Sequence, residues 1–164
     1  MAQLLMTLIS INSEFFYLYM YLLYLYINLF AGYKVGSTMV TADLHNVCRK
    51  IIDMDSKIRF AGIPNKFGKQ IVVEYRKGLD PLLTDSESEL YAIETVIRMN
   101  TRKDFESKLG KPIYSFTMYE KLKRVTIPLD NNDYPILMVS FDIEADEESI
   151  ILKKIIPFVK KELA

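Results

Sequence analysis

The sequence predicts an α/β domain of the α+β type, built on a five-stranded antiparallel sheet with helices on both faces. Three observations support this fold class. Apolar residues recur at helical spacing in three segments, and five short runs have the composition of strands. Short polar turns join the strand-like runs, as in hairpins and meanders, and such neighbours pair antiparallel. The predicted order of elements is α-β-β-α-β-β-β-α.

The first predicted elements are an amphipathic helix and a hairpin. The helix follows Met39, and its polar face carries His45. The hairpin has strands at 58–63 and 70–76, and Gly68 in its turn can adopt a positive φ. The apolar face of the helix combines residues three and four positions apart, namely Leu44, Val47, Cys48, Ile51 and Ile52.

A long second helix is predicted to begin near Thr84 or Ser86, because Thr84-x-x-Glu87 and Ser86-x-x-Glu89 both have the pattern of a capping box. Gly110 predicts its end, so that it spans about 22 residues. A last helix is expected over 146–163, with a kink or restart near Ile156, because Pro157 cannot continue a helix. The apolar stripe of the long helix is Leu90, Ile93, Val96, Ile97, Phe105 and Leu109. The strands between these two helices are predicted at 113–120, 122–129 and 134–143.

Residues 1–38 differ from the rest of the chain, and we treat them as a segment separate from a domain at 39–164. Phe15 to Ala31 carries no charge and is slightly shorter than the roughly 20 residues that cross a bilayer. We favour a mis-assigned start, with Met39 as the true one. A transmembrane anchor, with the domain on the cytoplasmic side, and a buried core helix are the alternatives. A secretory signal peptide fits less well, because a basic n-region is missing.

The charge and cysteine content exclude some classes of protein. The net charge is zero, so a nucleic-acid partner is not expected, since phosphate binding needs a basic excess. The single cysteine, Cys48, excludes an intrachain disulfide and favours the reducing cytoplasm.

Catalytic, cofactor and metal sites are not predicted, and the chain is not expected to be an enzyme. His45 is the only histidine and lies on an exposed helix face, whereas Cys48 is expected in the core. The glycines stand singly, without a phosphate-binding motif. The acidic residues of segments 80–87, 130–133 and 142–148 lack calcium-loop spacing and are assigned to caps and turns.

Short motifs in the chain resemble an uncharacterised protein family common in thaumarchaeal genomes. They are Lys57-Ile-Arg-Phe-Ala-Gly-Ile63, Arg76-Lys-Gly-Leu-Asp-Pro-Leu-Leu83 and Arg102-Lys-Asp-Phe-Glu-x-Lys-Leu-Gly110, within a likeness from Leu44 to about Phe141. The order of elements resembles Roadblock (dynein light-chain-like) and profilin-like domains. The Roadblock resemblance implies a dimer that binds or regulates small GTPases, which is an analogy from fold to function.

The leading hypothesis is a non-catalytic regulatory or scaffolding module that acts through protein–protein contacts. The alternative is a small-molecule sensor of the PAS or profilin-like kind, and either is membrane-tethered only if residues 1–38 are an anchor. A homodimer is expected to use the long helix and the neighbouring edge strand. Tyr91 and Met99 lie outside the predicted apolar stripe and are therefore the candidate dimer-interface residues.

The first prediction concerns the domain boundary. A chain of residues 39–164 is expected to be soluble and to unfold cooperatively, because helical and strand periodicity begins only after Met39. Circular dichroism during denaturant unfolding measures the secondary-structure content and the cooperativity of the transition. Insolubility, or loss of most secondary structure relative to the full chain, would place residues 1–38 inside the fold.

Overall fold

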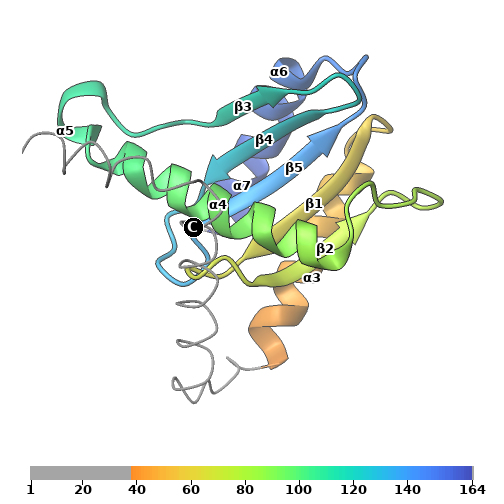
Figure 1. Ribbon diagram of the computed structural model, residues 1–164, viewed down its shortest axis with the longest axis horizontal. Helices are drawn as coiled ribbons and strands as arrows, with labels where there is room; N and C mark the ends of the chain where they lie inside the picture. Colours follow the sequence, from red (N-terminus) through yellow and green to blue (C-terminus); the bar gives the residue numbers. More distant parts are fainter. Residues whose placement is uncertain (1–37, 164) are drawn as a thin grey trace, which may run out of the picture. The chain divides into compact units, whose positions relative to one another are not determined.

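The computed structural model of the chain describes residues 38–163, and its helices and strands follow the predicted order. Residues 1–37, which include the stretch Phe15 to Ala31 considered as a mis-assigned start or a transmembrane anchor, lie outside the described residues. Among residues 38–163, no helix has the length and apolar character that a bilayer crossing requires. The elements are α3 (Thr38–Asp53), β1 (Ile58–Pro64), β2 (Gln70–Tyr75), α4 (Asp85–Lys103), α5 (Glu106–Leu109), β3 (Ser115–Met118), β4 (Lys123–Pro128), β5 (Ile136–Phe141), α6 (Glu147–Ile150), the π-helix η1 (Ile151–Ile155) and α7 (Ile156–Glu162) (Figure 1).

The five strands form one antiparallel sheet in the order β2-β1-β5-β4-β3. The hairpin β1–β2 and the meander β3–β4–β5 are each built from neighbours in the sequence. The pairing of β1 with β5 joins them, although the two strands lie far apart in the chain. The predicted five-stranded antiparallel sheet is therefore confirmed, and its spatial strand order comes from the structure.

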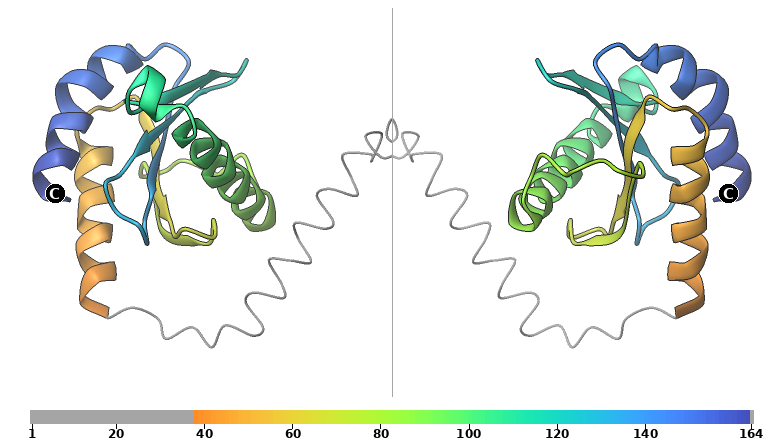
Figure 2. Two further views of the ribbon diagram at one scale, coloured as in Figure 1. Left: turned by 90° about the vertical axis from the view of Figure 1, so that its left-hand side faces the viewer. Right: turned by 90° about the vertical axis from the view of Figure 1, so that its right-hand side faces the viewer.

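Helices cover both faces of the sheet (Figure 2). One face packs against α3 and the carboxy-terminal helices in a core of eighteen buried residues, including Ile51, Ile58 and Phe141. The opposite face packs against α4 in a core of only six buried residues. The smaller core consists of Phe60, Ala92, Val96, Met99, Ile136 and Met138. The layer that contains α4 is consequently held by much less apolar contact than the layer that contains α3.

Several local features that the sequence predicted are present in the structure, although Gly110 ends the short helix α5 and not the long helix. Thr84 caps α4 with a reciprocal capping box, in which its backbone N–H donates to Glu87 Oε2 at 2.8 Å. Gly68 in the hairpin turn has a φ of 86°, and Gly110 after α5 has a φ of 82°. In the last helix a π-helical turn ends at Ile155 and the α-helix restarts at Ile156, as predicted from Pro157.

The second helix is shorter than predicted, because it ends at Lys103 and is followed by the separate four-residue helix α5. Beyond Met99 no residue of α4 is buried, so burial against the sheet does not support further turns. Phe105, which was predicted on the apolar stripe, instead lies between α4 and α5 and is exposed.

The buried face of α4 also differs from the prediction. Met99, predicted outside the stripe, is only 2% exposed and packs in the smaller core, whereas Leu90 is 42% exposed. Ile93 lies on the flank against the hairpin turn, where a β-carbon at Gly68 would lie 2.4 Å from its Cα. Apolar residues occur around most of this helix, so their spacing alone does not identify the face that the sheet covers.

The second prediction tests which face of α4 is buried. Met99→Ala is expected to lower the free energy of unfolding by about 2 to 4 kcal/mol, because it leaves a cavity in the smaller core. Leu90→Ala, the control on the outward face, is expected to change it by about 0.5 kcal/mol or less. Urea unfolding followed by circular dichroism measures both. A larger loss for Leu90→Ala would contradict the assignment.

Candidate interaction surface

The edge strand β3 is the most exposed strand of the sheet. It pairs with β4 on one side, and within the described residues its other side has no strand partner. Phe116, Met118 and the following Tyr119 are all exposed large side chains. An edge strand offers unpaired backbone N–H and C=O groups, and the apolar side chains make this edge suited to contact with another polypeptide.

Tyr91 connects α4 to this edge of the sheet. The guanidinium carbon of Arg124, on β4, lies 4.0 Å from the centre of the Tyr91 ring, and that of Arg98 lies 5.5 Å from it. Burial and a hydrogen bond with Tyr91 raise the pKa of Tyr119. The predicted interface residue Tyr91 is thus half-buried and braces α4 against the β3–β4 hairpin.

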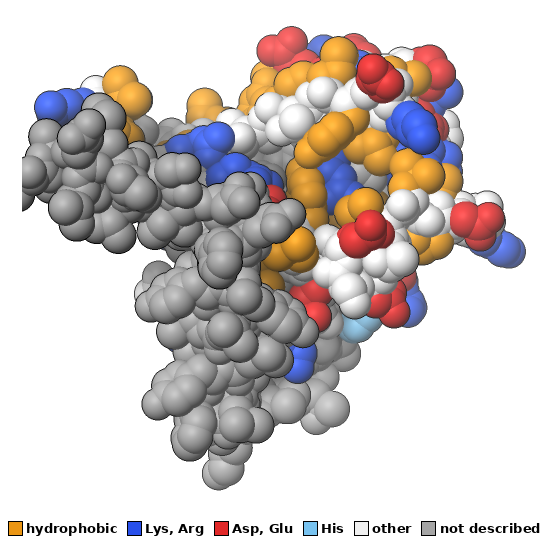
Figure 3. Space-filling view, in the orientation of Figure 1, with side chains coloured by type: hydrophobic (Ala, Val, Ile, Leu, Met, Phe, Trp, Pro, Cys, Tyr) orange, Lys and Arg blue, Asp and Glu red, His pale blue; other side chains and the backbone are white. Residues whose placement is uncertain are grey.

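Hydrophobic and basic side chains intermingle on the face of the molecule that carries α4 (Figure 3). The candidate contact surface on this face consists of the β3 edge and the adjoining side chains of Tyr91, Arg124 and Tyr119. Met99 is not part of this surface, because it lies in the core beneath α4. The use of Tyr91 in a dimer stays a prediction.

The strongest charged cluster joins three strands. Asp142, which follows β5, accepts hydrogen bonds from Arg59 of β1 at 2.7 Å and from Arg76, next to β2, at 2.6 Å. The hydrogen bond from Arg76, reinforced by Arg59, holds the pKa of the Asp142 carboxyl below its ordinary value. The sequence analysis assigned Asp142 to a turn and did not connect it with these arginines.

A second charged contact that the sequence analysis missed is the buried Lys123 on β4. Its Nζ donates to Glu147 Oε2 at 2.6 Å and to the carbonyl oxygen of Ala145 at 2.8 Å. Lys123 lies on the same face of β4 as the buried residues Val125 and Ile127, because every second residue of a strand shares a face. This spacing in the sequence could have indicated that Lys123 is buried. Its contacts attach the amino-terminal end of the last helix to the sheet.

His45 and Cys48 lie three positions apart on α3, and Glu74 of β2 influences both side chains. His45 Nδ1 lies 2.7 Å from Glu74 Oε1, so the histidine pairs with β2 and does not simply face solvent as predicted. Cys48 is fully buried, as predicted, and burial raises the pKa of its thiol to about 12. Within residues 38–163, no group of three or more His, Cys, Asp or Glu side chains has a metal-binding arrangement.

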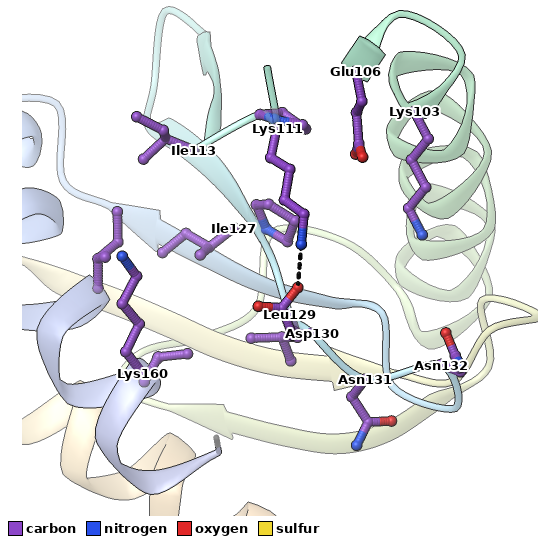
Figure 4. Close-up of a pocket in the computed structure, with 14 residues that line it drawn as sticks. Lys103, Glu106, Lys111, Ile113, Ile127, Leu129, Asp130, Asn131, Asn132 and Lys160 are labelled. Carbon is purple, nitrogen blue, oxygen red and sulfur yellow. Dashed lines mark hydrogen bonds and ion pairs between the residues drawn. The ribbon is translucent and has the colours of Figure 1, made fainter.

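A hollow of about 490 Å³ lies between α7, the β4–β5 turn and the segment that leads into β3 (Figure 4). Ile127 and Val159 are buried residues that line it, whereas Lys103 and Lys160 enter it from α4 and α7. Lys111 Nζ lies 3.3 Å from Asp130 Oδ1 at the solvent-exposed rim of the hollow. Its volume is in the range of small-molecule sites, and its walls are partly apolar and partly charged.

No protein-family model and no curated protein matches the chain. Solved structures match it at low identity. The gliding protein MglB from Thermus thermophilus is 10% identical with a TM-score of 0.61, and the match covers 79% of this chain and 94% of that one. A Roadblock/LC7 domain from Streptomyces avermitilis is 14% identical with a TM-score of 0.54, covering 74% of this chain and 98% of that one.

Myxococcus xanthus MglB is 14% identical with a TM-score of 0.57, and the match covers 77% of this chain and 92% of that one. The domain has a Roadblock-like fold. The resemblance predicted from the order of elements is therefore confirmed for the fold. The dimer hypothesis, which uses the long helix α4 and a neighbouring edge strand, stays a prediction.

The third prediction concerns acid stability. The pKa of Asp142 is lowered in the folded protein, so its carboxylate adds stability above the ordinary value of 3.8, and this is lost as the pH falls through the folded pKa. Asp142→Asn is expected to cost about 1 to 3 kcal/mol at pH 7, because it weakens charge-assisted hydrogen bonds.

The same variant is expected to have a flatter dependence of stability on pH below about pH 4, measured by urea unfolding from pH 7 to pH 2. Asp130→Asn is the control, because Asp130 is largely exposed and its ion pair with Lys111 lies in solvent. Equal pH profiles for wild type and Asp142→Asn would contradict the role of the Asp142 cluster.

Proposed function

We propose that the domain is a non-catalytic regulatory or scaffolding module that acts through protein–protein contacts in the cytoplasm. The observation that carries this proposal is the β3 edge, with its unpaired backbone and exposed Phe116 and Met118. A polypeptide that adds a strand to such an edge gains main-chain hydrogen bonds and buries these apolar side chains. Rigid support for the contact comes from Tyr91 and Arg124, which fix α4 beside the hairpin.

The proposed first partner is a second copy of the chain, in a homodimer. Two-fold pairing of β3 edges would bring the two α4 helices close together and present the same surface on both subunits. A stable contact of this kind buries about 1,200 to 2,000 Å² in total. The proposal is supported by the Roadblock-like fold, and one similar structure, of MglB, has a tetrameric arrangement.

A small GTPase is the proposed heterologous partner, by analogy with other Roadblock proteins. The outward flank of α4, with the exposed Leu90 and the half-buried Ile97, gives such a partner an apolar helical surface. Affinity purification of the protein followed by mass spectrometry of bound proteins tests this analogy.

A second candidate function is small-molecule sensing of the PAS or profilin-like kind. The hollow that contains Lys111 and Asp130 favours it, because its volume of about 490 Å³ suits a small ligand. The two cores between sheet and helices are filled by side chains, so a ligand would use this hollow beside the sheet.

The fourth prediction tests the dimer. Phe116→Lys combined with Met118→Lys is expected to shift a dimer to monomer at tens of micromolar protein, because the lysines place like charges at the paired edges. Sedimentation equilibrium of the full chain measures the mass. Leu152→Lys, at an exposed apolar residue of η1 on the opposite face of the sheet, is the control and is expected to remain dimeric.

A wild-type chain that is monomeric in this concentration range, or a double variant that associates as strongly as wild type, would show that β3 is not the dimer interface. Circular dichroism of each variant distinguishes loss of association from loss of folding.

A further inference from the structure

The segment that joins α4 to β3, residues 102–113, projects from the end of the sheet at the left of Figure 1, and we name it the α5 corner. It contains three large apolar side chains that face solvent: Phe105 is 58% exposed, Leu109 is 82% exposed and Ile113 is 64% exposed. The helix α5 within it has no buried residue. Clustered apolar side chains of this size in water are unfavourable and mark an interaction site.

The α5 corner is also basic. It carries four cations, Arg102, Lys103, Lys108 and Lys111, against the two acids Asp104 and Glu106. Its formal charge is therefore plus two, although the net charge of the whole chain is zero. Basic and hydrophobic side chains are next to each other at this end of the molecule in Figure 3.

The shape of the α5 corner distinguishes between occupants. Phe105 and Leu109 are on the turn and short helix, with cations between them. Ile113 follows them and lines the adjacent hollow, whose lining also includes the charged residues Lys103, Glu106 and Lys111. Exposed apolar residues interspersed with lysines are the features by which peripheral proteins enter the headgroup region of anionic membranes. A groove-binding peptide would instead need a concave apolar surface.

We propose that the α5 corner docks on an anionic membrane surface. Phe105, Leu109 and Ile113 enter the boundary between headgroups and acyl chains, while the lysines contact acidic headgroups. This contact uses residues outside the β3 edge, so it goes beyond the proposed protein–protein function and does not depend on it. It is also separate from any anchor in residues 1–38.

The test places an environment-sensitive fluorophore on the full chain at Ser107→Cys, in the middle of α5. Cys48 does not compete for the label, because it is fully buried. Vesicles with about one third phosphatidylserine in phosphatidylcholine are expected to shift the emission to shorter wavelength, whereas pure phosphatidylcholine is not. The same label at Ser86→Cys, at the opposite end of α4, is the control and is expected not to shift.

Two double variants test the residues. Lys108→Gln with Lys111→Gln is expected to weaken vesicle binding at least tenfold, since each cation near the surface contributes about fivefold. Phe105→Ser with Leu109→Ser is expected to abolish the spectral shift. Leu82→Ser is the matched control, because Leu82 is 57% exposed but lies outside the α5 corner. Circular dichroism checks that each variant is folded.

Several results would overturn the proposal. The first is an equal emission shift with neutral and anionic vesicles. The second is vesicle binding that neither double variant weakens. The third is vesicle binding through residues 1–38 that leaves the label at Ser107→Cys in water. A label that becomes buried only as protein concentration rises would assign the α5 corner to a second copy of the chain. Each of these outcomes leaves the sedimentation test of the β3 edge unaffected.

Discussion

The fold depends on the central strand β5, whose six residues are all buried. It pairs with β4 on one side and with β1 on the other, so it holds the meander and the hairpin in one sheet. Residues on one face of β5, such as Leu137 and Val139, enter the larger core, whereas Ile136 and Met138 enter the smaller one. Its nearly continuous apolar sequence follows from this position, because both of its faces are covered by helices.

The two cores differ in size, and this difference decides which apolar side chains remain exposed at the surface. The larger core fixes α3 and the carboxy-terminal helices, while α4 is held by the six-residue core and by contacts at its sides. The side contacts include the close approach of Ile93 to Gly68, the stacking of Arg124 on Tyr91 and the hydrogen bonds from Gln70 to Ser88. Apolar residues that the smaller core cannot cover, such as Leu90 and Phe105, remain at the surface. Both proposed contact regions therefore lie on or beside the α4 layer.

Charged side chains connect elements that are distant in the sequence. Asp142 contacts arginines 83 and 66 positions away, and Lys123 contacts Glu147 across 24 positions. Such pairs do not follow from spacing along one helix or strand, because the tertiary arrangement of strands, loops and the last helix brings them together. Their partial burial makes the removal of one partner costly, since the other charge then lacks its hydrogen bonds.

Local chemistry in the sequence was enough to predict the strands, the hairpin, the capping box at Thr84 and the helix restart at Ile156. Each of these features depends on neighbouring residues: a hydroxyl and a carboxylate three positions apart, a proline without an N–H, or a regular alternation. The Roadblock-like order of elements followed from them. Only the tertiary structure decided that Met99 is buried while Leu90 faces outward, and that α4 ends before Phe105. The physical reason is that burial depends on where the sheet surface lies, and the sheet is assembled from strands far apart in the chain.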